Sequence, residues 1–98
     1  MSRYIFSPKA RDDLQEIWCY IAMDNPVAAD RLEEDIYAAC EKLATQPHLG
    51  HSRPDLTSEP ILFWKVRSVY LVIYLKKTQP LNIIRILHGA RNVSVELD

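Results

Sequence analysis

Two apolar stripes with helical spacing follow one another along the chain, and the break between the two predicted helices lies at Asp24, Asn25 and Pro26. A residue that can cap a helix, followed by a proline, stands before each stripe: Ser7-Pro8 before the first and Asn25-Pro26 before the second. Proline is tolerated at the first position of a helix. So short a connection makes the two helices run antiparallel, as a hairpin. Both stripes are too apolar to face water, so the hairpin needs a second layer to pack against. The stripes comprise Ala10, Leu14, Ile17, Trp18 and Ile21, then Ala29, Leu32, Ile36, Ala39, Cys40 and Leu43.

Strands supply that second layer. Residues 61–66, 70–75 and 81–87 are rich in β-branched and aromatic side chains and are joined by tight connections, and residues 3–7 form a short first strand. Residues 47–60, with three prolines, form a loop. The fold class predicted is α+β in the order β-α-α-β-β-β, with the helical hairpin packed on one face of a small, mainly antiparallel sheet. Residues 1–98 form a single domain.

Charge is distributed unevenly along the 98 residues, although the formal net charge is only −1. Residues 1–50 hold five basic and nine acidic residues, whereas residues 51–98 hold seven and four. The basic half indicates a local interaction surface, or the split reflects only the acidity usual in surface helices. No apolar run reaches the roughly 20 residues that span a bilayer, and the N-terminus lacks the apolar core of a signal peptide. We therefore expect a cytoplasmic protein with no membrane partner, in which Cys19 and Cys40 are free thiols.

Alternation along the three later strands separates two faces of the sheet. One face is almost wholly apolar or aromatic and is predicted to pack against the helices: Leu62, Trp64, Val66, Tyr70, Val72, Tyr74, Ile84, Ile86 and His88. Two helices cover only one face, so the second is predicted to be a partly exposed apolar groove with a basic rim that binds an acidic protein segment. Alternatively, the 47–60 loop or the C-terminal tail covers it. The candidate binding residues on this face are Phe63, Lys65, Arg67, Leu71, Ile73 and Arg85.

The order and spacing of four segments resemble those of the RelE/ParE superfamily of type II toxins. The segments read SPKARDDLQEIWCYIAMDNPVAADRLEEDI, PHLGHSRPDL, VYLVIYLKK and IIRILHGARNV. The last is similar to the terminal strand signature of the ParE branch. This resemblance implies a toxin that inhibits DNA gyrase and is neutralised by a cognate antitoxin. It implies as well that the complex contacts DNA only through the antitoxin. It also implies a hetero-oligomer and a target surface at the end of the last strand that includes His88, Arg91 and Asn92.

The alternative within the superfamily is a ribosome-dependent endoribonuclease of the RelE type, which uses cations on the open sheet face. Lys65 and Arg91 match two such positions, but Phe63 and Leu71 stand at two others, and Leu97 stands where an aromatic residue is expected. RNA cleavage needs a base, an acid and cations, so this depleted set favours the ParE branch and no catalytic residue. A third possibility is a non-toxic module that only binds its antitoxin.

His48 and His51 form an H-x-x-H pattern in the loop without the further ligands that a metal ion needs. We therefore expect no metal site and no cofactor.

Overall fold

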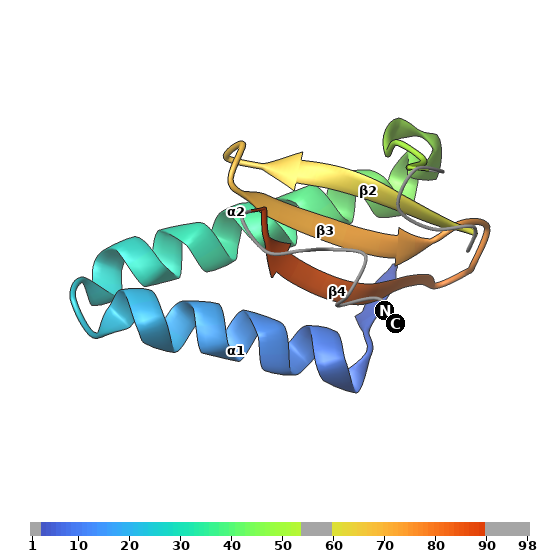
Figure 1. The fold of residues 1–98 in the computed structure, drawn as a ribbon. Coiled ribbons are helices and arrows are strands. Elements are labelled where there is room, and N and C mark those ends of the chain that lie inside the picture. Colours follow the sequence, from blue (N-terminus) through green and yellow to red (C-terminus); the bar gives the residue numbers. More distant parts are fainter. Residues whose placement is uncertain (1–2, 54–59, 90–98) are drawn as a thin grey trace.

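The computed structural model describes residues 3–53 and 60–89 (Figure 1). It confirms the predicted order of elements and adds a short 3-10 helix, η1, after the hairpin. The predicted bounds of the second and third strands are confirmed, and the fourth strand is one residue longer than expected. The elements are β1 (Tyr4–Phe6), α1 (Pro8–Ala22), α2 (Pro26–Thr45), η1 (Pro47–Leu49), β2 (Ile61–Val66), β3 (Tyr70–Leu75) and β4 (Leu81–His88).

Both helices begin where the sequence predicts, because a side chain caps each first turn. The Ser7 hydroxyl accepts a hydrogen bond from the Ala10 N–H at 3.0 Å. The Asn25 side-chain oxygen accepts one from the Ala28 N–H at 3.1 Å. Each cap satisfies a backbone donor that has no partner within the helix. The two capped starts fix where the helices begin, and the second places the turn of the hairpin just before α2.

The four strands form one sheet in the order β1-β4-β3-β2. β1 pairs with β4 in parallel, and the remaining pairs are antiparallel. Both helices lie on one side of this sheet (Figure 1). The main core lies between these layers, where apolar side chains of α2 meet those of the inner strands. Its fully buried members include Leu32, Ile36, Leu43, Val72, Tyr74 and Ile86.

The predicted alternation fails at one point in β4. Ile73 pairs with Arg85 and Tyr74 with Ile83, so Ile84 is an extra residue, as in a β-bulge. A bulge reverses which side chains face the helices on one side of it. Ile83 is therefore fully buried in the helix-side core, and Ile84 packs on the other face. The assignment of Ile84 to the helix side was wrong for this reason.

Tyr74 fastens the segment after α2 to the centre of the sheet. Its hydroxyl donates to the Pro47 carbonyl oxygen at 2.6 Å and accepts from the Gly50 N–H at 2.9 Å. Burial raises the pKa of Tyr74 above its ordinary value, against the smaller opposing effect of the Gly50 N–H. A methyl group on Gly50 would overlap the Tyr74 hydroxyl and lie 2.9 Å from the Leu62 Cβ. Only glycine leaves room for this contact.

We expect Gly50→Ala to lower the free energy of unfolding by about 2–4 kcal/mol, because overpacking and the loss of the Tyr74 hydrogen bonds add together. Urea denaturation followed by circular dichroism measures the change. Ser52→Ala is the matched control, since Ser52 is exposed in the same segment. Equal midpoints for the two variants would contradict the tight packing at Gly50.

Candidate functional site

The face of the sheet turned away from the helices carries a second apolar cluster, and no described helix or strand lies over it. Its buried members have exposed fractions between 0% and 8%. The predicted placement of Phe63, Leu71 and Ile73 on a common face is confirmed. The predicted partly exposed groove is wrong in its extent, because these side chains are almost inaccessible. The cluster comprises Ile61, Phe63, Leu71, Ile73 and Leu87, with Leu75 and Ile84 partly buried against it.

Access to this cluster is through a cleft of about 380 Å³ at its β2 edge, which we call the basic cleft. Phe63 and Leu71 line the cleft, and Lys65 lies exposed beside them, as predicted for these three residues. The ring of His51 stacks on that of Trp64, with 6.3 Å between centroids. The cleft therefore combines apolar surface with positive charge. Its lining is His51, Arg53, Phe63, Trp64, Lys65 and Leu71.

Arg85 does not belong to the rim of this face, where it was predicted. Its Nε lies 2.7 Å from Asp13 Oδ2, and a second guanidinium nitrogen lies 2.9 Å from Asp13 Oδ1. The Ile86 N–H donates to the same carboxylate at 3.0 Å. Both side chains of the pair are nearly buried, at 13% and 10% exposed. The charge of Arg85 is therefore compensated within the protein, by α1.

This arrangement follows from the length of β4. β1 pairs only with the first residues of β4, up to Ile83, so the outer edge of β4 has no strand partner beyond that point. The Ser7 hydroxyl donates to the Ile84 carbonyl at 2.8 Å, and Asp13 accepts from the Ile86 N–H. The two side chains take the place of a neighbouring strand along this edge. An acidic residue directly beside the apolar stripe of α1 is the sequence signal that could have identified Asp13.

Arg67 is also displaced from its predicted place. It lies in the β2–β3 turn at a φ of 54°, followed by Ser68 at 58°, as in a turn with two left-handed central residues. Its Nε is 2.6 Å from Asp35 Oδ2 of α2. The pair is about half exposed, which makes its contribution small. Arg67 thus faces the helix layer instead of the second apolar cluster.

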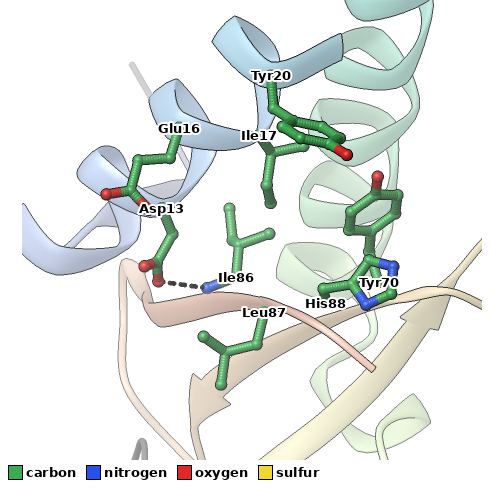
Figure 2. Close-up of a pocket in the computed structure, with 8 residues that line it drawn as sticks. All are labelled: Asp13, Glu16, Ile17, Tyr20, Tyr70, Ile86, Leu87 and His88. Carbon is green, nitrogen blue, oxygen red and sulfur yellow. Dashed lines mark hydrogen bonds between the residues drawn. The ribbon is translucent and has the colours of Figure 1, made fainter. Parts of the chain in front are cut away.

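A second cleft, of about 430 Å³, lies between α1 and the adjoining ends of β3 and β4 (Figure 2). We call it the aromatic cleft. His88 lies at its edge, and its ring meets that of Tyr70 edge-on at 5.4 Å between centroids. Of the other predicted target-binding residues, Arg91 and Asn92 lie outside the described residues. The lining comprises Asp13, Glu16, Ile17, Tyr20, Tyr70, Ile86, Leu87 and His88.

A family model described as the ParE toxin of the type II toxin-antitoxin system, parDE, matches residues 4–93. The chain belongs to the ParE toxin family. A solved structure titled "Chromosomal ParDE TA system from P. aeruginosa" is similar, with a TM-score of 0.70 and 21% sequence identity. That alignment covers 87% of this chain and 92% of the other. No curated protein matches the sequence.

Membership of the ParE family makes this chain the toxin of a type II toxin–antitoxin system, in which an antitoxin protein is the partner. The similar ParDE structure confirms the predicted fold, two helices on one face of a four-stranded sheet. None of the described helices is long and apolar enough to cross a membrane. Within residues 3–53 and 60–89, no three His, Cys, Asp or Glu side chains are grouped so that they could hold a metal ion.

In this ParE-family toxin we expect Asp13→Asn to lower the free energy of unfolding by about 3 kcal/mol, because it leaves the charge of Arg85 buried without a counter-ion. Asp35→Asn is the matched control, since it breaks an exposed pair of the same type and should cost less than about 1 kcal/mol. Urea denaturation of both variants checks the difference. Similar small losses would show that the Asp13 pair is screened like a surface pair.

Proposed function

We propose that this toxin inhibits DNA gyrase without a catalytic residue of its own, and that its antitoxin neutralises it by direct binding at the basic cleft. Membership of the ParE family supports gyrase as the target. One observation favours it over RNA cleavage: carboxylates of the helices neutralise two of the three cations predicted for the open sheet face.

RNA cleavage by attack of a 2′-hydroxyl builds negative charge on the phosphorus oxygens, which cations must stabilise. Arg67 and Arg85 are paired with Asp35 and Asp13. Phe63 and Leu71 occupy two positions where the resemblance implies cations, and both are buried. Among the described strand residues of this face, Lys65 therefore stands in place of a cluster of cations. This chemistry suits a binding protein better than a nuclease.

The basic cleft suits an acidic antitoxin segment that carries an apolar side chain. Phe63 and Leu71 provide an apolar wall, and Lys65 provides a charge beside it. Ile73 lies deeper in the same cluster and is fully buried, so it would support the wall instead of touching the partner. Segments of this kind are disordered when free and fold as they bind. The positive charge would also speed their encounter with the toxin.

The proposed target surface lies at the end of β4 and includes His88, followed in sequence by Arg91 and Asn92. Tyr70 pairs with His88, and the next residue of β3, Leu71, pairs with Lys65. His88 on β4 and Lys65 on β2 therefore lie near the same end of the sheet, on the two strands that flank β3, about two strand spacings apart. An antitoxin bound in the basic cleft would hinder access of gyrase to this end of the sheet. We expect it to neutralise the toxin by blocking the target surface.

A ribosome-dependent endoribonuclease is the second candidate, and one observation favours it. The basic cleft brings His51, Arg53 and Lys65 together beside the ring of Trp64. An imidazole, two cations and an aromatic face are groups that RNA cleavage and base stacking can use.

The double variant His51→Ala/Lys65→Ala separates the two candidates. A gyrase inhibitor should keep its effect on supercoiling and DNA cleavage by purified gyrase within about two-fold, and induced expression should still arrest growth with a DNA-damage response. Transcript mapping after induction should show no new cleavage sites. Unchanged supercoiling by the unmodified toxin, together with messages cut on the ribosome and lost cutting in the variant, would establish the nuclease instead.

Lys65→Glu tests the antitoxin surface. Reversing a charge at the edge of an interface mainly slows association, so the association rate with the cognate antitoxin should fall about ten-fold at low salt and the difference should shrink as salt rises. Lys76→Glu is the matched control: the same change at an exposed lysine just beyond the opposite end of β3. Stopped-flow or surface-plasmon measurements give the rates. Equal association rates for both variants would show that the antitoxin does not bind at the basic cleft.

A further inference from the structure

We propose that the aromatic cleft receives an arginine side chain presented by a protein partner. The inference goes beyond the proposed function, because it concerns the chemistry that the cleft accepts and holds for whichever protein supplies the arginine.

Two tyrosines shape the mouth of the cleft. Figure 2 shows the hydroxyl ends of Tyr20, from α1, and Tyr70, from β3, facing one another across the opening, with His88 beside Tyr70. Tyr20 is 80% exposed, so its ring is available to a partner. Aromatic faces attract cations through the negative potential of the ring. Together with His88, the two tyrosines place three aromatic rings at the opening of the cleft.

Glu16 supplies the negative charge that selects a cation. It lies one helical turn before Tyr20 on the same face of α1 and lines the cleft. Its carboxylate is exposed, and the described residues place no hydrogen-bond or ion-pair partner on it. Asp13, the other acid of the cleft, already holds Arg85 through both oxygens. Glu16 therefore provides the uncompensated charge of this site, which repels phosphate and carboxylate ligands.

The inner surface of the cleft suits the aliphatic part of a long basic side chain. Ile17 and Ile86 lie beside the two tyrosines, on the side toward Asp13, in Figure 2. A long side chain can bury its methylene groups against such residues while its charged end remains near water. Arginine fits better than lysine, because its planar guanidinium stacks on aromatic rings and bonds a carboxylate with two N–H groups.

A protein fits better than a free small cation, because exposed apolar side chains follow Tyr20 at the tip of the helical hairpin. Met23 lies three residues beyond Tyr20 and is 88% exposed, and Val27, at the start of α2, is 59% exposed. These side chains form the tip of the helical hairpin. Exposed apolar surface beside a polar recess is typical of protein-binding sites. A partner would bury this tip while it inserts its arginine.

Titration of the full chain with N-acetyl-arginine amide, followed by NMR of the aromatic side chains, tests the proposal. We expect saturable shifts confined to Tyr20, Tyr70 and His88. The citrulline analogue has the same shape without the charge and should cause no such shifts. Glu16→Gln should weaken arginine binding about five-fold, the effect of one partly exposed charge pair. Tyr20→Leu should weaken it further while leaving the urea midpoint unchanged.

Glu34→Gln is the matched control, an exposed glutamate on α2 outside the cleft, and should bind arginine like the unmodified protein. Equal shifts with citrulline, shifts spread over the surface, or no saturable shift would each overturn the proposal. Because the readout is binding alone, a toxin that failed to inhibit gyrase could still pass this test, and an active gyrase inhibitor could fail it.

Discussion

The carboxylate of Asp13 joins the two layers of this protein, and much of the arrangement around the site depends on it. One group compensates the charge of Arg85 and accepts the Ile86 N–H at an edge where β4 has no strand partner. An unpaired edge exposes a row of backbone donors and acceptors, which invites pairing with other chains. Covering that edge with a side chain from α1 closes it and holds the helix against β4.

The contact of Asp13 with β4 also separates the basic cleft from the aromatic cleft. With α1 held against the outer edge of β4, the aromatic cleft opens between the helix and the strand ends, whereas the basic cleft opens on the other face, beside β2. Pairing of Tyr70 with His88 and of Leu71 with Lys65 brings both clefts to one end of the sheet. A protein this small has few positions for two partners, and a shared end makes binding of one partner bear directly on the other.

Local rules predicted most of the fold. Ser7 and Asn25 cap the helices where the sequence indicates, and the alternation of apolar side chains defines β2 and β3 to the residue. The alternation misplaced Ile84 because a bulge depends on the pairing of two strands, and one strand read alone shows no sign of it. The predicted exposure of Phe63, Leu71 and Ile73 failed for a similar reason: alternation assigns a side chain to a face but does not determine how much of that face is covered.

The charges were the least predictable part, because long side chains reach beyond the face that their Cα positions suggest. Arg85 reaches α1 around the edge of β4, and Arg67 reaches α2 from a turn with positive φ. The acidic helices and the basic sheet half of the sequence therefore compensate one another in part within the fold. Among the charges outside these two ion pairs, Lys65 lies at the basic cleft and Glu16 lies at the aromatic cleft, and the two are opposite in sign. Opposite charges at adjoining clefts favour different segments at each, so one end of a small sheet can distinguish two binding chemistries.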